Sequence, residues 1–194
     1  MADSTRSMLV PDTEPGIIWR SKLLRIGKFT VGPLGEWEVE SGRVTSWHPT
    51  AAAMESAGRA PVSPVPISFM QGQHLRNYCD RHAAGLNFSR QIIASCEAPG
   101  HCDIGAMNEA VNAYLRRHDT FRSWFEHTDD DQFVRHSLVD PEEIEFEPVD
   151  HGELSVEQIR AHVTDIPTPL EWGCFTFGII QSEDHFTFFA AMDH

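Results

Sequence analysis

The residues that could do chemistry are first of all the cysteines and histidines, which bind metals or act as nucleophiles and bases near neutral pH. Cys96, His101 and Cys102 lie close together, but no second pair of ligands stands at a zinc-finger spacing and no Cys-x-x-Cys occurs. Four scattered cysteines are also too few for a disulfide scaffold. We therefore expect buried free thiols and no metal site.

Six of the eleven histidines fall within segments expected to be helical or extended, where a hydrogen-bonded or surface histidine is the ordinary case. We expect no catalytic role for these six, which are His74, His82, His118, His136, His162 and His185. His194 differs from them because it follows an apolar segment at the end of the chain.

The charge pattern excludes a general nucleic-acid binder, because a chain with a formal net charge of −14 repels phosphate. No glycine-rich phosphate loop occurs either. Residues 119–194 carry 3 basic and 18 acidic side chains. The acidic charge of this segment predicts a solvated face, or a surface that meets another part of a larger protein.

Capping residues mark the helices that position any site. Ser68 with Gln71 and Ser155 with Gln158 are capping boxes, and the first of these helices should end by Gly85. Asp103 caps a further helix. Its apolar stripe consists of Ile104, Met107, Val111, Tyr114 and Leu115.

Extended segments separate these helices. A small hairpin is expected from Leu23–Val31 and Trp37–Trp47, followed by a surface linker over 48–66 that contains four prolines. Phe88–Cys96 reads as a strand, and so does the alternating segment around Ile144. Thr120–Phe125 and Phe133–Val139 should pair around an aspartate-rich turn.

Gly173–Gln181 and His185–Met192 flank a polar turn and are apolar on both faces, which predicts a hairpin at the centre of a sheet. The alternation of strands and helices favours an α/β class, with a mixed sheet and flanking helices. The chain stops at the end of this apolar strand, so we expect a fragment cut within a domain.

Three motifs resemble, in their order, the condensation-domain/chloramphenicol-acetyltransferase-like acyltransferases. They are Ser68-x-x-Gln71 before a helix, the segment R-H-D-T-F-R-S-W-F at 117–125, and a strand that ends in a histidine. The middle segment is similar to the superfamily's R-H-E-x-L-R-T-x-F. Shorter blocks further resemble the mycobacterial polyketide-associated acyltransferases, which build trehalose glycolipids: L-R-R-H-D-T at 115–120, G-C-F at 173–175, F-G-I at 177–179 and D-H-F-T-F at 184–188.

The resemblance implies which residues do the chemistry. The superfamily's H-H-x-x-x-D-G motif would begin at Asp193, in place of the first, non-catalytic histidine, and His194 would be the general base. A neutral imidazole with a pKa of about 6.5 can remove the proton of a sugar hydroxyl that attacks an acyl thioester. His118 is implied to be structural, and Arg117 and Arg122 to order the helix-to-strand turn through buried salt bridges.

The resemblance also implies the organisation of the chain. Residues 23–194 would form the N-terminal lobe of a chloramphenicol-acetyltransferase-like two-lobed fold, truncated at the active-site motif, after a flexible leader over 1–22. The end of the catalytic motif and the second lobe would lie beyond residue 194. We therefore expect this chain alone to be inactive.

The implied function is transfer of a long acyl group from a thioester carrier to a hydroxyl of a trehalose-type glycolipid. The partners would be an acyl thioester of coenzyme A or of a polyketide-synthase carrier and a sugar or glycolipid acceptor, with no cofactor and no nucleic acid. Peripheral association with a membrane is left open. The absence of an apolar leader or an 18-residue apolar run predicts a cytoplasmic protein.

Two other functions are compatible with the sequence. One is a truncated, catalytically inactive remnant or partner-binding module, which an unpaired strand edge at 185–192 would make prone to aggregate. The other is a self-contained α/β domain that binds a small ligand.

Overall fold

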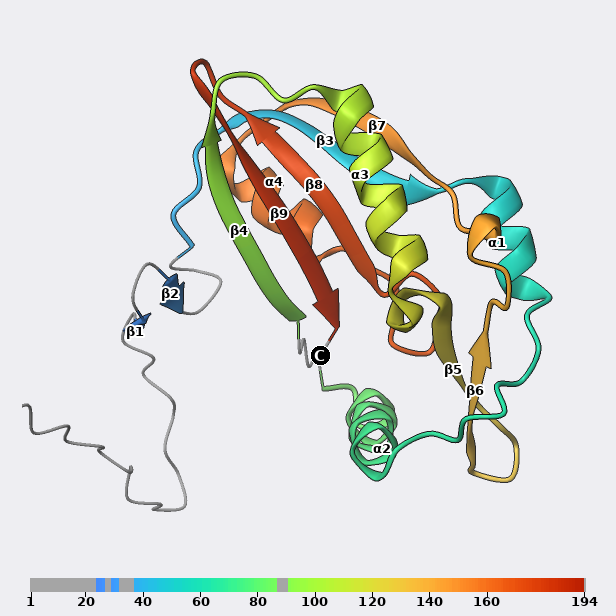
Figure 1. Ribbon diagram of the computed structural model, residues 1–194. Helices are drawn as coiled ribbons and strands as arrows, with labels where there is room; N and C mark the ends of the chain where they lie inside the picture. The colour runs from blue at the N-terminus through green and yellow to red at the C-terminus, as the bar shows by residue number, and fades with distance from the viewer. Residues whose placement is uncertain (1–23, 27–28, 32–36, 87–90, 194) are drawn as a thin grey trace, which may run out of the picture. The chain divides into compact units, whose positions relative to one another are not determined.

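A computed structural model describes residues 24–26, 29–31, 37–86 and 91–193 (Figure 1). The chain divides into two compact units, residues 1–38 and 39–194. In the first unit, β1 (Leu24–Ile26) pairs antiparallel with β2 (Phe29–Val31). The expected leader over 1–22 lies outside the described residues.

The second unit is built on a five-stranded sheet with the strand order β4-β9-β8-β3-β7. Every neighbouring pair in this sheet is antiparallel. The strands are β3 (Gly42–Pro49), β4 (Gln91–Pro99), β7 (Phe146–Leu154), β8 (Phe175–Gln181) and β9 (His185–Asp193).

The α/β class with flanking helices is confirmed, but the mixed sheet that we expected is wrong for the described strands. The reason lies in the connections. The helix that follows β7 leads to β8, two places away in the sheet, and β3 fills the position between them with the opposite direction. The expected hairpin of Leu23–Val31 with Trp37–Trp47 is also wrong, since β1 and β2 pair with each other and β3 pairs with β7 and β8.

The hairpin of β8 and β9 occupies the centre of the sheet, as its apolar faces predicted. Gly178 allows a close approach there, because a Cβ atom at this position would lie 2.2 Å from Cζ of Phe189. The Phe189 ring is fully buried. The two strands therefore contribute buried side chains to the core of the unit.

Helices cover both faces of the sheet, with α3 (Ile104–Arg117) in front and α4 (Val156–Thr164) behind in Figure 1. The Asp103 side chain accepts a hydrogen bond from the Ala106 amide, and the Ser155 capping box is complete. Both predicted helix starts are thus confirmed. The buried stripes are Val111 and Leu115 on α3 and Ile159 and Val163 on α4.

A helix, α1 (Ala51–Gly58), occupies much of the segment that we expected to be a linker. Thr50 caps it by accepting a hydrogen bond from the Ala53 amide, and an alanine run has the highest helix propensity. Ala53 and Ala57 are buried. The prediction was wrong because Pro49 precedes the cap, where it does not interrupt the helix.

The remaining helix, α2 (Phe69–Ala83), begins at the predicted capping box of Ser68 and ends before Gly85, which has a φ of 68°. The predicted hairpin is confirmed as β5 (Ser123–His127) and β6 (Phe133–Ser137). Its first strand starts later than expected because Asp119–Arg122 form a 3₁₀ turn.

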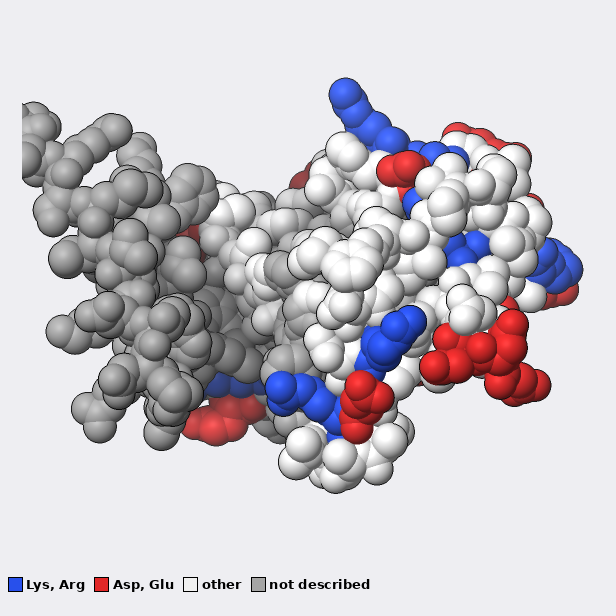
Figure 2. Space-filling model, turned by 90° about the horizontal axis from the view of Figure 1, so that it is seen from below, with Lys and Arg blue, Asp and Glu red and all other residues white. Residues whose placement is uncertain are grey.

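The face seen from below carries a mixed charge pattern. In Figure 2 acidic side chains form separate groups, basic side chains adjoin several of them, and uncharged residues make up much of the rest. Among the described residues, none of the helices has the length and apolar character to cross a membrane.

Candidate functional site

The strand predicted to carry the catalytic base lies inside the sheet. β9 pairs with β4 on one side and with β8 on the other, so the unpaired edge expected at 185–192 is wrong. The Asp193 amide donates a hydrogen bond to the Cys174 carbonyl at 3.0 Å. His194 lies outside the described residues, and its role as the base stays a prediction.

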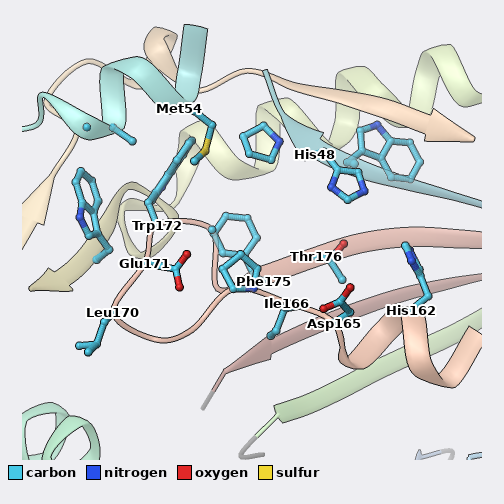
Figure 3. A pocket seen from close by; sticks show the side chains of 17 residues that line it. His48, Met54, His162, Asp165, Ile166, Leu170, Glu171, Trp172, Phe175 and Thr176 are labelled. Carbon is cyan, nitrogen blue, oxygen red and sulfur yellow. The ribbon is translucent and has the colours of Figure 1, made fainter. Parts of the chain in front are cut away.

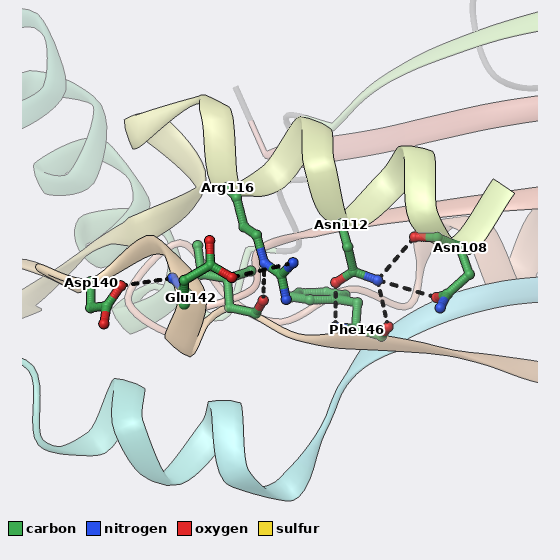
Figure 4. Close-up of polar contacts among 7 residues, drawn as sticks. Asn108, Asn112, Arg116, Asp140, Glu142 and Phe146 are labelled. Carbon is green, nitrogen blue, oxygen red and sulfur yellow. Dashed lines mark hydrogen bonds and ion pairs between the residues drawn. The ribbon is translucent and has the colours of Figure 1, made fainter. Parts of the chain in front are cut away.

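The buried salt bridges that we expected from Arg117 and Arg122 are not found among the described residues. Arg117 is exposed, and neither it nor Arg122 forms an ion pair with a described residue. Arg116 instead connects α3 to the segment before β7, because its Nε donates to the Ile144 carbonyl at 3.0 Å and its Nη1 lies 3.6 Å from a Glu142 oxygen (Figure 4). Helix phase explains the difference, since one residue along a helix is a turn of 100°.

A buried asparagine joins the same helix to β7. The Asn112 amide nitrogen donates to the Phe146 carbonyl at 2.9 Å, and its oxygen accepts from the Phe146 amide at 2.8 Å (Figure 4). Asn112 is 7% exposed, so this pair satisfies a strand's backbone groups within the core. Helical periodicity does not indicate this role, because the partner Phe146 lies 34 residues away in the sequence.

All four cysteines are free, as predicted, but they are not fully buried. Cys96 is exposed and the other three are partly exposed. Burial raises the pKa of the Cys174 thiol to about 11, so this group is not a reactive thiolate near neutral pH.

A pocket of about 610 Å³ opens beside the ends of β3 and β8, between α1, the end of α4 and the segment 165–173 (Figure 3). One end is polar and the other apolar. His48, His162, Asp165 and Thr176 lie toward the polar end, and Met54, Leu170 and Trp172 lie toward the other, where Glu171 is the one labelled charged side chain. Such a concave, mostly apolar site with a few converging polar groups is typical of a small-molecule site.

Three histidines converge on one hydroxyl beneath this pocket. The Ser46 Oγ lies 2.8 Å from Nε2 of His48, 2.8 Å from Nε2 of His151 and 3.1 Å from Nε2 of His162. Ser46 is fully buried, so it is not accessible as a nucleophile. A hydroxyl donates one hydrogen bond and accepts two, which matches three neutral imidazoles in mixed tautomers.

The electrostatics of this cluster also favour neutral rings. Burial lowers the pKa of His48, and the neighbouring His151 lowers it further. Burial likewise lowers the pKa of His162, with smaller contributions from His151 and His48. Within the described ranges, no group of three or more His, Cys, Asp or Glu side chains is arranged to hold a metal ion. The arrangement is therefore a hydrogen-bonded cluster that shapes a binding pocket.

The spacing of residues along the sequence indicates only part of this cluster. Ser46 and His48 are two residues apart on a strand and therefore share a face. His151 joins them through the pairing of β3 with β7, which includes a register shift between Val44 and Thr45. His162 arrives from α4. The periodicity of single segments contains no information on these pairings, which is why we assigned His162 no role.

Comparisons with known proteins confirm the resemblance to the mycobacterial polyketide-associated acyltransferases. The chain is 52% identical over 172 residues to "Acyltransferase PapA3" of Mycobacterium tuberculosis, which covers 89% of this chain and 36% of the relative. It is 48% identical over 171 residues to the M. tuberculosis protein PapA1, named 2'-acyl-2-O-sulfo-trehalose (hydroxy)phthioceranyltransferase, with 88% of this chain and 34% of the relative covered. No protein-family model matches the chain.

A solved structure confirms the fold. The structure titled "PapA2 acyl transferase" superposes with a TM-score of 0.78 at 46% sequence identity, covering 83% of this chain and 35% of that chain. The chloramphenicol-acetyltransferase-like class expected from the motifs is therefore correct. The chain spans about a third of the length of the curated relatives it matches.

Proposed function

We propose that this chain supplies one lobe, residues 23–194, of an acyltransferase that moves a long acyl group from a thioester to a hydroxyl of a trehalose-type glycolipid. The observation that carries the proposal is the 52% identity over 172 residues to an acyltransferase. The trehalose acceptor is proposed from the name of PapA1. The reaction is proposed to take place in the cytoplasm.

His194 is the proposed base, from its place after Asp193 at the end of β9. Its imidazole would take the proton of the acceptor hydroxyl while the oxygen attacks the thioester carbonyl. The departing thiolate would then receive that proton, which leaves an ester and a free thiol. The donor, an acyl thioester of coenzyme A or of a polyketide-synthase carrier, is a substrate in this proposal, and no prosthetic group takes part.

A chimera tests the proposal. Residues 39–194 of this chain replace the matching segment of PapA2, and transfer from palmitoyl-coenzyme A to trehalose and to 2-O-sulfo-trehalose is followed by mass spectrometry. We expect acylated 2-O-sulfo-trehalose to form at a rate within about tenfold of that of PapA2 itself, which is named a trehalose-2-sulfate acyltransferase. We expect none from the 194-residue chain alone, for which the proposal provides a single lobe.

A chimera that folds and unfolds cooperatively but transfers no acyl group would contradict the proposal. That outcome would favour the alternative of a catalytically inactive, partner-binding module. The paired β9 already removes the exposed edge on which the expected aggregation of such a module rested.

A further inference from the structure

We propose that Cys79 is a nucleophile that accepts acyl groups, with His127 as its general base and Asp131 as the residue that positions this base. The three side chains come from α2, from the end of β5 and from the turn between β5 and β6. The ligand is an activated acyl compound, in which a carbonyl carbon carries a thiolate or phenolate leaving group. The site goes beyond the proposed function and does not depend on it.

The first observation is a chain of contacts through one imidazole. Nε2 of His127 lies 2.8 Å from Oδ1 of Asp131, and Nδ1 of the same ring lies 3.8 Å from Sγ of Cys79. A carboxylate only accepts hydrogen bonds, so the neutral ring has its proton on Nε2 and none on Nδ1. Nδ1 can therefore accept the proton of the Cys79 thiol. A nucleophile, a base and a group that orients the base are thus in contact in that order.

This arrangement differs from a metal site. Cys79 and Asp131 contact opposite nitrogens of the ring, so the imidazole lies between them and the three groups do not converge on one point. Within the part of the chain that the structure describes, no three His, Cys, Asp or Glu side chains form a metal-binding group. Cys79 is also free of any disulfide. Its thiol is therefore left for reaction with a carbon electrophile.

The neighbouring side chains fix the imidazole and the helix. The His127 ring stacks on Phe133, with ring centroids 4.6 Å apart and planes 19° apart, and Phe133 is 8% exposed. The guanidinium carbon of Arg76 lies 5.8 Å from the centre of the same Phe133 ring, which joins α2 to the β5–β6 hairpin (Figure 1). Arg76 and Cys79 are three residues apart on α2 and therefore share a face. This contact presents Cys79 to His127.

The turn fixes the carboxylate. Asp131 has a φ of 60°, a left-handed conformation that Asp and Asn adopt more readily than most residues. Its amide donates to the Thr128 carbonyl at 3.0 Å, and the Thr128 amide donates to the Gln132 carbonyl at 2.9 Å. The closed turn therefore holds the Asp131 side chain next to His127.

The proposed reaction is an acyl transfer to sulfur. As Sγ of Cys79 attacks the carbonyl carbon, Nδ1 of His127 takes the thiol proton, and the bond to the leaving group then breaks. The leaving thiolate or phenolate receives that proton from Nδ1, which leaves a thioester on Cys79 and a neutral imidazole. Asp131 accepts the Nε2–H hydrogen bond throughout and stabilises the imidazolium that forms in between.

The protonation state of the thiol distinguishes this site from an ordinary reactive cysteine. Cys79 is partly exposed and the His127 side chain is 33% exposed, so a small acyl compound can reach Sγ from solvent. Burial raises the pKa of the Cys79 thiol, and the carboxylates of Asp80 and Asp131 raise it further. A fast reaction at Cys79 therefore requires a base that removes the proton during the attack.

The experiment incubates the 194-residue chain with p-nitrophenyl acetate and follows acetylation of each cysteine by mass spectrometry of its peptide. The exposed Cys96 is the internal reference. The variants are His127→Gln, Asp131→Gly and Asp131→Asn. Glycine adopts a φ of 60° without strain and removes the carboxylate, whereas asparagine keeps the shape and an acceptor oxygen. The matched control is Asp129→Asn, an exposed position of the same turn.

We expect Cys79 to be acetylated at least about tenfold faster than Cys96, whereas burial alone would make it slower. His127→Gln should slow acetylation of Cys79 by about a hundredfold and Asp131→Gly by about tenfold. Asp131→Asn should react within about threefold of the wild type, because an amide oxygen can also orient the base. The rate at Cys96, and both rates in Asp129→Asn, should be unchanged.

The proposal is overturned if Cys79 reacts no faster than Cys96, or if His127→Gln leaves the rate at Cys79 unchanged. The comparison of the two cysteines is made in the unsubstituted chain, so it decides the question even if a variant fails to fold. Because His194 takes no part in this reaction, neither result bears on the proposed function.

Discussion

At the scale of single residues, Asn112 is the polar group on which the packing of α3 against β7 depends most. Replacing it by alanine leaves the Phe146 amide and carbonyl buried without partners. We expect Asn112→Ala to lower the free energy of unfolding by about 2–4 kcal/mol, measured by urea denaturation. Asn77→Ala, at an exposed position of α2, is the control and should change stability by less than about 0.7 kcal/mol. Equal effects of the two substitutions would refute this role.

The histidine cluster predicts a pH dependence of stability. The folded-state pKa values of His48 and His162 are lowered from about 6.5, so the folded protein binds their protons less readily than the unfolded chain does. Their contribution to stability is therefore present above pH 6.5 and is lost as the pH falls through the folded-state values.

The measurement is the urea midpoint at pH 7.5 and at pH 5.5. We expect a lower midpoint at pH 5.5, and a smaller difference in His162→Gln than in the control His101→Gln, an exposed loop position. His185, whose pKa is raised by its hydrogen bond with Asp184, contributes with the opposite sign, and it does so equally in both variants. The same pH difference in both variants would exclude the cluster as its source.

At the scale of elements, the close contact of β8 with β9 depends on Gly178. An added methyl group would lie within 2.2–3.0 Å of three atoms of the Phe189 ring, which has no space to move into. We expect Gly178→Ala to destabilise the protein by about 1–3 kcal/mol in urea denaturation.

A second glycine provides the control for this effect. Gly72 lies within α2, where a Cβ atom would meet nothing nearer than Ile67 Cδ1 at 3.8 Å. Gly72→Ala should therefore stabilise the protein by about 0.5–1 kcal/mol, through helix propensity. If Gly178→Ala also stabilised the protein, backbone entropy rather than the contact with Phe189 would dominate.

Local signals predicted most of the elements, with α1 as an exception, and pairing between distant segments accounts for the strand partners that were missed. The capping boxes at Ser68 and Ser155 depend on residues three apart, and both predicted helices are confirmed. The β8–β9 hairpin likewise depends on a short turn. The partners of β3 lie about 100 or more residues away along the chain, and no periodicity within Trp37–Trp47 could identify them.

The candidate site was only partly predictable for the same reason. The motifs gave the resemblance and the strand end that precedes His194. The motifs did not indicate the pocket, because its lining residues come from separate elements and meet only in the folded unit. Thr176 lies on β8, His48 on β3 and His162 on α4. Arg116 rather than Arg117 contacts the segment before β7, because the phase of α3 within the core decides which side chain reaches Ile144.

At the scale of the whole molecule, the proposed reaction is supported by the fold and by the position of β9 in the sheet. The fold agrees with an acyltransferase structure at a TM-score of 0.78. In the sheet β9 has a partner on each side, so the residue proposed as the base follows a strand that is paired along both edges. The pocket beside β8 lies close to that strand end, since Gly173 and Phe175 line it and the Cys174 carbonyl accepts a hydrogen bond from the Asp193 amide.

The most direct test of the central claim is the kcat/KM for acyl transfer to 2-O-sulfo-trehalose, measured in the PapA2 chimera with His194 and with His194→Ala. General base catalysis predicts a loss of about 10²–10⁴-fold in the variant. The control His101→Ala should keep its activity within about twofold. If His194→Ala transferred the acyl group as fast as the control does, His194 would not be the base, and the proposed mechanism would be wrong.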